Sequence, residues 1–434
     1  MSISSEMHNS ACPNETEQKM ALRSSETVCR SKNKVRLAYL VSHPIQYQAP
    51  LLRRIAREPD IDLTVFFGSD FSLRSYQDEG FGVDVKWDVP LLDGYRSEFL
   101  PAIRDDGTQT VTTPLNYGIF SALGGADVAF DVLWVHGYAM VNALHGMVAA
   151  KALGIPVLLR GDMWLRDRPR SGAKLFLKQL FFQLLKNLVS GILPVGTLNE
   201  QYWKYYLGDE IPLFLMPYAV DNEYFQLRSL EAAATREGLL RELNIVAGRP
   251  VILFASKLQQ RKHCSDLLDA YRILIGRKMS GPQPYLVIVG DGEQRAKLEE
   301  QARINGLTDI RFCGFRNQSE LPRFFDIASV FVLPARHEPW GLVVNEAMNA
   351  ARAVVVSDDV GCHPDLITNG VEGFVFPVGD VNALADALLR VLATPDTAAK
   401  MGENALRRIK KWSFEEDVFA LREAIAQLTH KIVA

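Results

Sequence analysis

The sequence predicts an α/β protein with two Rossmann-like domains that face each other across a cleft. Its 434 residues are enough for two domains, because a globular domain typically spans about 100–200 residues. In both halves of the chain, short apolar runs alternate with amphipathic helical patterns, as in parallel α/β units. This alternation is interrupted near residues 217–228 and then starts again, which indicates a connection between two similar halves.

The strands predicted in the first half are apolar runs rich in Val, Leu, Ile and Phe. They cover residues 35–42, 61–68, 131–137, 155–162 and 191–196. Amphipathic segments at residues 47–58 and 140–154 lie between them and predict helices.

The second half repeats this pattern. Its predicted strands cover residues 250–256, 285–292, 310–315, 329–335, 353–359 and 373–379. Residues 264–276 and 294–306 have helical periodicity and separate some of these strands.

These elements divide the chain into five predicted parts. They are a disordered extension (1–33), an N-terminal Rossmann-like domain (34–218), a linker (219–248), a C-terminal Rossmann-like domain (249–405) and a C-terminal helix (406–434). For the last helix, a return onto the first domain remains an open alternative. The first part lacks the apolar run of a signal peptide and is rich in Ser, Glu, Asn and Thr.

Composition narrows the class of protein. The net charge of −3 gives no bulk reason to expect a nucleic-acid partner. The cysteines are scattered without a C-x-x-C pair, which fits a cytoplasmic protein without a disulfide scaffold or zinc site. The Asp-x-Asp sequence at residues 60–62 precedes its strand and therefore faces away from the cleft, so we expect no metal site.

Residues 175–195 contain many apolar side chains together with Lys178 and Lys186. These charges make a membrane span unfavourable. One reading is a buried amphipathic helix whose lysine face, over residues 174–186, is solvated. The other is a surface helix that contacts an anionic membrane.

The stretch RHEPWGLVVNEAM, residues 336–348, has a glutamate on each side of an expected helix start at Gly341 or Leu342. Ligands of open parallel sheets bind at the carboxyl ends of strands, and Glu338 directly follows one. The free N–H groups of the helix start suit a phosphate, and a glycine lets the phosphate approach the backbone. Glu338 and Glu346 would then accept hydrogen bonds from hydroxyl groups on either side of a diphosphate.

Cations for this diphosphate are available after another strand. The segment SKLQQRKH places Lys257 and Lys262 in the loop that follows the strand at residues 250–256. Both ammonium groups can turn toward one diphosphate and stabilise the charge that develops when it leaves.

Five motifs in this order resemble the retaining, nucleotide-sugar-dependent glycosyltransferases of the GT-B fold, the large glycosyltransferase family 4 (glycosyl transferases group 1). The family's glutamate, seven residues, glutamate signature corresponds to Glu338 through Glu346, and its basic pair corresponds to Lys257 and Lys262. The other matching stretches are VIVGDGEQRAKLE (287–299), FCGF (312–315) and DDVGCHPDLITNGVEGFVFPVGD (358–380). The close resemblance covers roughly residues 250–380.

The resemblance implies a role for each matching residue. Glu338 would hold hydroxyls of the donor sugar, Glu346 the ribose, and Lys257 and Lys262 the diphosphate. The remaining implied donor-binding residues are Gly290 in the second motif, Phe315 and Arg316 beside the base, and Gly341 and Leu342 with N–H groups toward the phosphate. The implied catalytic residues are His136, Lys262 and Glu338.

The N-terminal domain would supply the acceptor side. His136 ends a predicted strand and resembles a family histidine near the reacting carbon, although a core histidine is the alternative. Arg160 and Asp162 end the next strand and are candidates for contact with acceptor or donor.

Two features depart from the family pattern. The loop at residues 42–50 lacks the usual glycines, so His43, Gln46 and Tyr47 are expected to offer side-chain hydrogen bonds instead. Lysine stands at position 257 where arginine is usual, which keeps the charge but loses the fork geometry.

The expected activity is therefore transfer of a hexose from a nucleotide diphosphate sugar to an acceptor hydroxyl with retention of configuration. Its expected setting is glycan assembly for a bacterial envelope or exopolysaccharide, with a glycan or lipid-linked acceptor. We expect no cofactor, and a cytoplasmic location with possible peripheral contact with the anionic inner membrane. Alternatives are a sugar-nucleotide epimerase or phosphorylase of similar architecture, or a catalytically silent binding homologue. A dinucleotide dehydrogenase is disfavoured, since no G-x-G-x-x-G follows the first strand.

Overall fold

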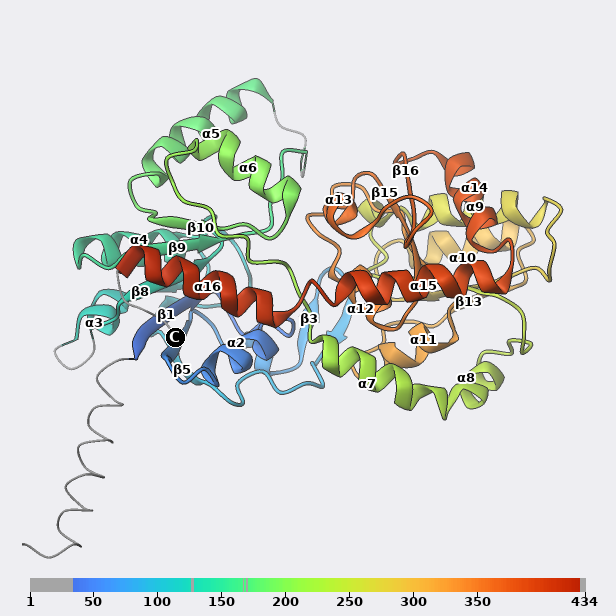
Figure 1. Cartoon of the computed structure of the whole chain (residues 1–434), viewed down its shortest axis with the longest axis horizontal. Helices are drawn as coiled ribbons and strands as arrows, with labels where there is room; N and C mark the ends of the chain where they lie inside the picture. Colours follow the sequence, from blue (N-terminus) through green and yellow to red (C-terminus); the bar gives the residue numbers. More distant parts are fainter. Residues whose placement is uncertain (1–33, 126–128, 167, 169–170, 430–434) are drawn as a thin grey trace, which may run out of the picture.

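The computed structural model describes residues 34–125, 129–166, 168 and 171–429. The extension expected at residues 1–33 lies outside the described residues. Within the described part, the chain forms two six-stranded sheets and two small two-stranded sheets. Figure 1 shows the two large sheets in separate domains, side by side along the long axis of the molecule.

The sheet of the N-terminal domain has the order β10-β9-β8-β1-β2-β5, and its neighbouring strands are parallel. Its strands are β1 (Val35–Val41), β2 (Ile61–Phe67), β5 (Arg96–Phe99), β8 (Val132–His136), β9 (Val157–Arg160) and β10 (Gly191–Leu193). All the runs predicted in this half form strands. Strand β5 was not predicted, because this edge strand reads RSEF and lacks the apolar run of a buried strand.

The sheet of the C-terminal domain has the order β13-β12-β11-β14-β15-β16, also parallel. Its strands are β11 (Val251–Ala255), β12 (Tyr285–Val289), β13 (Ile310–Phe312), β14 (Val330–Leu333), β15 (Ala353–Ser357) and β16 (Gly373–Phe376). Each was predicted from its apolar run. Five consecutive buried residues in β11, β12 and β15 show why, since helices cover both faces of such strands.

Two small antiparallel pairs are inserted between β2 and β8. They are β3 (Tyr76–Asp78) with β4 (Val83–Val85), and β6 (Ala102–Arg104) with β7 (Leu115–Asn116). In Figure 1, β3 lies between the two domains rather than within either sheet.

Helices cover the faces of both sheets. In the N-terminal domain they are α2 (Ala49–Ala56), α3 (Ile119–Gly124), α4 (Val141–Ala152), α5 (Gly172–Leu185), α6 (Thr197–Leu207) and the short 3-10 turn η1 (Phe71–Leu73). Those that follow are α7 (Asn222–Ala233), α8 (Arg236–Glu242), η2 (Gln260–Lys262), α9 (Cys264–Ile275), α10 (Arg295–Ile304), α11 (Leu321–Ile327), α12 (Leu342–Asn349), α13 (His363–Leu366), α14 (Val381–Val391), α15 (Pro395–Ile409) and α16 (Phe414–Thr429).

Helix α5 differs from the buried helix with a solvated lysine face. Only Phe182 and Leu185 are buried among its described apolar residues. The large exposed side chains of this helix are Leu175, Phe176, Leu177, Leu180 and Leu184. Lys178 instead turns inward, with its Nζ 4.5 Å from the ring centre of Tyr202. The buried stripe is therefore narrow, because only one side of α5 has a domain surface to pack against.

The segment expected as a linker, residues 219–248, is largely helical. Helices α7 and α8 bring Phe225 and Leu239 into the same apolar core as Leu253 of β11 and Phe331 of β14. This segment is thus packed onto the C-terminal domain, because its apolar residues recur at helical spacing and find a surface there.

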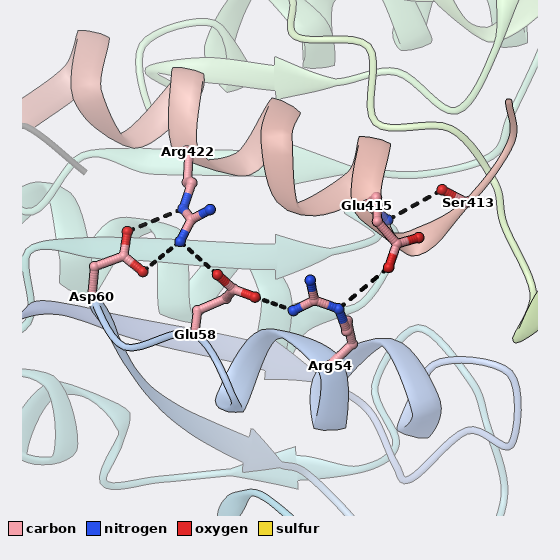
Figure 2. A network of polar contacts seen from close by, with 6 residues as sticks. All are labelled: Arg54, Glu58, Asp60, Ser413, Glu415 and Arg422. Atoms are coloured by element: carbon pink, nitrogen blue, oxygen red, sulfur yellow. Dashed lines mark hydrogen bonds and ion pairs between the residues drawn. The ribbon is translucent and has the colours of Figure 1, made fainter. Parts of the chain in front are cut away.

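The last helix, α16, returns to the N-terminal domain. Figure 2 shows Arg422 of α16 between two carboxylates, with its Nε 3.0 Å from Asp60 Oδ2 and its Nη2 2.5 Å from Glu58 Oε2. Arg54 of α2 contacts both Glu58 and, at 3.5 Å, Glu415 at the start of α16. Asp60 of the Asp-x-Asp sequence directly precedes β2 and forms an ion pair with Arg422.

Candidate active site

A cavity of about 360 Å³ lies between the two domains. Every residue expected to bind a donor lines it: Lys257, Lys262, Gly290, Phe315, Arg316, Glu338, Gly341, Leu342 and Glu346. Gln46 and Tyr47 of the N-terminal domain line the opposite wall. Lys257, Gly290 and Glu338 follow β11, β12 and β14, whose parallel order brings their carboxyl ends to one edge.

Glu338 is the centre of a buried charge cluster. Its Oε2 accepts from Lys262 Nζ at 2.5 Å and from Arg261 Nη1 at 2.9 Å. Burial of Glu338 opposes its charge, but the two cations outweigh that cost and hold the pKa of the carboxyl below its usual range. The carboxylate is therefore ionised at neutral pH. Arg261 was not singled out in the sequence, although it directly precedes Lys262.

Lys262 lies at the end of η2 and is buried. Burial lowers the pKa of its ammonium group, and the nearby charge of Glu338 offsets part of that effect. A buried ammonium next to an empty space is an attractive partner for a phosphate, because little water screens the charge there.

Lys257 has a partner that the sequence did not indicate. Its Nζ lies 2.7 Å and 2.9 Å from the two carboxylate oxygens of Asp78 on β3. The same Nζ lies 4.7 Å from the ring centre of Phe81. The N-terminal domain therefore already supplies an anion to one of the two expected diphosphate cations.

Helix α12 begins at the cavity wall. Its N-cap residue Gly341 has φ +91°, a conformation that favours glycine. This helix start was predicted. The free N–H groups of its first turn carry the positive partial charge of the helix dipole.

Glu346 lies one turn further along α12 and lines the cavity. Its Oε2 is buried and has no hydrogen-bond partner in the described part of the chain. Burial raises the pKa of this carboxyl to about 8. Buried polar atoms rarely lack a partner, so Glu346 fits a position whose partner arrives with a ligand.

Gly290 marks a close approach of two strand ends. Its φ is +134°, and a Cβ at this position would lie 1.9 Å from the carbonyl oxygen of Ser256. Phe315 and Arg316 follow the next strand, and Arg316 Nε donates to the carbonyl of Cys313 at 3.2 Å. This part of the cavity wall is therefore fixed by backbone contacts.

A second cavity, of about 230 Å³, lies in the N-terminal domain and contains His136, Tyr138, Met163 and Arg168 in its wall. Burial lowers the pKa of His136 to about 3, so its imidazole is neutral at physiological pH. His136 Nδ1 is buried without a hydrogen-bond partner among the described residues. A further small cavity is lined by both His136 and Tyr47, and Tyr47 also lines the cavity between the domains.

Arg160 lines neither the cavity between the domains nor the second cavity, but it lines the small cavity that His136 and Tyr47 share. It is 3% exposed and donates to the carbonyls of Met216 and Pro217 at 3.1 and 2.8 Å. Its Nη2 also lies 3.5 Å from Asp417 of α16. Arg160 therefore joins β9, the chain that leaves the N-terminal domain, and the returning helix.

Asp162 and His43 also line neither the cavity between the domains nor the second cavity. Asp162 acts on the nearby Tyr47 hydroxyl: burial, and then the charge of Asp162, raises the pKa of Tyr47 to about 12. His43 accepts or donates a hydrogen bond with Ser42 Oγ at 2.9 Å, its ring lies 4.7 Å from that of Phe71, and burial lowers its pKa to about 4. Of the loop residues expected on the acceptor side, only Gln46 and Tyr47 reach the cavity between the domains.

The described residues contain neither a grouping suited to a metal ion nor a helix suited to span a membrane. No group of three or more His, Cys, Asp or Glu side chains there is arranged to hold a metal ion. None of the described helices has both the length and the apolar character needed to cross a membrane.

Residues 235–408 match the family model described as glycosyl transferases group 1. The chain is 32% identical over 171 residues to alpha-D-kanosaminyltransferase of Streptomyces kanamyceticus, which covers 39% of this chain and 43% of that protein. It is 26% identical over 263 residues to the UDP-Gal:alpha-D-GlcNAc-diphosphoundecaprenol alpha-1,3-galactosyltransferase of Escherichia coli, covering 59% and 65%. The alignments therefore span less than two thirds of either relative.

Solved structures resemble the chain over almost its whole length. The sucrose-phosphate synthase of Thermosynechococcus elongatus superposes with a TM-score of 0.66 at 18% identity, over 92% of this chain and 100% of that one. HepE of Anabaena in complex with UDP superposes with a TM-score of 0.66 at 16% identity, over 91% and 100%. At such identities these similarities establish the shared fold.

Proposed function

Residues 235–408 belong to the glycosyl transferases group 1 family and the chain has the GT-B fold, and from this membership we propose that the protein is a nucleotide-sugar-dependent glycosyltransferase. It moves a hexose from a nucleotide diphosphate sugar to an acceptor hydroxyl and retains the configuration at the anomeric carbon. The observation that carries this proposal is the cavity between the domains, where ionised Glu338, two buried or half-buried lysines and the start of α12 meet.

The positions of the charged groups support one orientation of the donor in our proposal. Lys257, Lys262 and the N–H groups at the start of α12 bind the diphosphate, and Glu346 accepts hydrogen bonds from the ribose. Both cations beside Glu338 contact its Oε2, so its Oε1 takes hydroxyls of the donor sugar. The sugar is thereby held between the diphosphate and the N-terminal domain.

The reaction needs little covalent chemistry from the protein. The bond between the anomeric carbon and the diphosphate oxygen breaks, and the acceptor oxygen bonds to that carbon from the same face. The departing phosphate oxygen takes the acceptor's proton. Lys262 and the helix start stabilise the negative charge on the leaving diphosphate, which lowers the barrier most where water is excluded. Neutral His136, beyond Tyr47, lies on the acceptor side.

The second cavity supports a lipid-linked acceptor. Tyr138 in its wall lies 5.7 Å, between ring centres, from Phe181 of α5, whose outer side exposes large apolar residues. An acceptor glycan in this cavity would have its lipid near that helix, at an anionic membrane surface. The galactosyltransferase of E. coli named above carries a diphosphoundecaprenol acceptor in its name. We place the proposed reaction in bacterial envelope or exopolysaccharide glycan assembly.

The proposal is tested with Glu338→Ala. We expect at least a roughly hundredfold fall in turnover, the scale seen when a group that stabilises the transition state is removed. Affinity for a nucleoside diphosphate should persist, because Glu338 contacts the sugar and its loss frees two cations. Transfer is measured with a panel of nucleotide sugars, and nucleotide binding by calorimetry. Glu403→Ala, an exposed glutamate of α15, is the control and should leave both unchanged.

Two results would contradict the proposal at different points. An equal loss of nucleotide affinity and turnover in Glu338→Ala would show that the glutamate holds the nucleotide. Binding of nucleotide sugars by the unmodified protein without transfer or donor hydrolysis would identify a catalytically silent binding homologue.

A further inference from the structure

A hairpin of the N-terminal domain is fastened to the C-terminal domain at two points. We define the hairpin segment as residues 76–88, which contain β3 and β4. At one end Asp78 holds Lys257, as described above. At the other end Asn317 Nδ2 donates to the carbonyl of Lys86 at 2.7 Å, and Ser319 Oγ donates to Asp88.

The tip of the hairpin segment fits closely against the loop after β11. A Cβ added to Gly80 would lie 2.6 Å from Lys257 Cδ and 3.0 Å from Gln259 Nε2. Asp78 also fixes this tip, since its Oδ1 accepts from the N–H groups of Gly80 and Phe81, both at 2.9 Å. The hairpin segment is therefore a defined wall of the cavity.

This wall contributes aromatic rings at the end of the cavity nearest Phe315. The ring of Phe81 lies 4.7 Å from that of Phe315 at 70°, and the ring of Trp87 lies 6.5 Å from it. All three residues line the cavity between the domains. Nucleobases stack on such rings, because each base presents a flat π-face.

The same cavity is lined by a polar side chain with an unpaired atom among the described residues. Gln318 lines the cavity, and its Oε1 is buried without a hydrogen-bond partner in the part of the chain that the structure describes. Its neighbours Asn317 and Ser319 are the residues bonded to the hairpin segment. Its position is thus fixed from both sides, and a buried amide oxygen in this setting calls for a donor from a ligand.

We propose that the hairpin segment completes the nucleobase site, with Phe81 and Trp87 extending one aromatic wall that includes Phe315 and with the Gln318 amide hydrogen-bonding an N–H group of the base. This inference rests on the proposed function and adds to it residues that select the nucleotide. It also means that the base is bound only when the two domains are docked. Base recognition and domain closure are therefore linked.

The experiment compares ligands with and without a base. Dissociation constants are measured for UDP, GDP and ribose 5-diphosphate, and the preference is the ratio of the ribose 5-diphosphate constant to the nucleotide constant. In Phe81→Ala and Trp87→Ala this preference should fall roughly tenfold for the better nucleotide, as expected for a lost stacking partner. In Gln318→Leu it should fall about fivefold, as expected for one lost hydrogen bond.

Asp84→Ala is the matched control, because Asp84 lies on the same hairpin but is exposed and lies outside the cavity wall. It should keep the preference of the unmodified protein. A variant that is poorly folded would lose both ligands together, which the ratio separates from loss of base recognition.

The outcomes distinguish this inference from the proposed function. An unchanged preference in both aromatic variants, or a parallel loss of all three ligands, overturns the role of the hairpin segment while leaving the donor site in place. If the unmodified protein binds none of the nucleoside diphosphates that glycosyltransferases use as donors, the donor site itself is refuted and the inference with it.

Discussion

The carboxyl of Glu346 combines burial with a missing partner. Its Oε2 is unpaired among the described residues, and its pKa is raised to about 8 by burial alone. Such a group destabilises the folded protein in the absence of a ligand, because the unfolded chain can ionise it freely. Binding sites often retain this kind of cost where function requires the group.

The direction in which pH changes the free energy of unfolding follows from the number of protons that Glu346 binds in the folded and the unfolded state. Between about pH 4.5, the ordinary value of a glutamate, and pH 8 the folded state holds a proton on Glu346 that the unfolded state has released. Since the folded state then binds more protons, the contribution of this group to the free energy of unfolding falls as the pH rises through this window.

We therefore expect Glu346→Gln to raise the melting temperature, by a few degrees at pH 8 and by little near pH 4.5. A change of 1 kcal/mol moves the midpoint by about 2–4 °C in domains of 150–250 residues. The same variant should bind nucleoside diphosphates several-fold more weakly, because ribose hydroxyls that donate to Glu346 favour its ionised form, in which both oxygens accept, whereas an amide offers one acceptor oxygen. Calorimetric melting from pH 4.5 to 8.5 and binding titrations measure the two effects.

Glu423→Gln, an exposed glutamate of α16, should show neither change. A Glu346→Gln protein that melts at lower temperature than the unmodified protein at pH 8 would contradict the unpaired, buried state of this carboxyl.

At the scale of single elements, α5 is the helix whose environment departs most from expectation. Phe176, Leu177 and Leu184 are each more than half exposed. Lys174 is also exposed, and the helix itself, Gly172–Leu185, contains no acidic residue. An apolar side next to positive charge, with no cover in the described structure, fits a surface that rests on anionic lipid.

We expect the protein to float with vesicles that contain phosphatidylglycerol and to remain behind with neutral phosphatidylcholine vesicles. A Phe176→Ser/Leu180→Ser double variant should lose at least a factor of about ten in partitioning, since each buried apolar side chain contributes about 1.5–3 kcal/mol. The control is Leu227→Ser/Leu230→Ser, which alters two exposed leucines on α7 of the other domain. Equal flotation with both kinds of vesicle would argue against this surface. An equal loss of partitioning in the two double variants would argue against it as well.

At the scale of the whole molecule, the chain ends in the domain where it begins. Leu421 of α16 is fully buried in the same apolar core as Leu37 of β1 and Trp134 of β8. The buried Arg160 and Asp417 meet across this junction, and burial raises the pKa of Asp417 to about 7 despite the charge of Arg160. The N-terminal domain is therefore completed by residues that follow the C-terminal domain in sequence.

Leu421→Ala should lower the free energy of unfolding of the N-terminal domain by about 2–5 kcal/mol, the usual cost of a cavity left by a buried leucine. Phe419→Ala on the same helix should change it by less than about 0.5 kcal/mol, because Phe419 is exposed. Urea denaturation with a probe in each domain measures both. A similar loss in the two variants would mean that α16 is attached by its surface charges rather than through the core.

The sequence by itself determined the two sheets and the expected donor residues that line the cavity between the domains. Apolar runs identify central parallel strands because such strands are buried on both faces, and the edge strand β5 was missed because it is not. Lys257 and Glu338 were found because each follows such a strand, and parallel strands bring their carboxyl ends together whatever the loops do. Gly290 was expected from the resemblance of its motif to the family.

Only the tertiary structure decided which residues of the other domain meet them. Asp78 contacts Lys257 across 179 positions of sequence, and the exposure of α5 depends on which elements the chain leaves beside it. Arg160 ends strand β9, at the same carboxyl edge of its sheet that was expected to face a ligand, yet it pairs with Asp417 of the returning helix α16. Local sequence patterns report the burial and periodicity of one segment. These contacts depend instead on how the two domains dock, because the docking surfaces are assembled from distant parts of the chain.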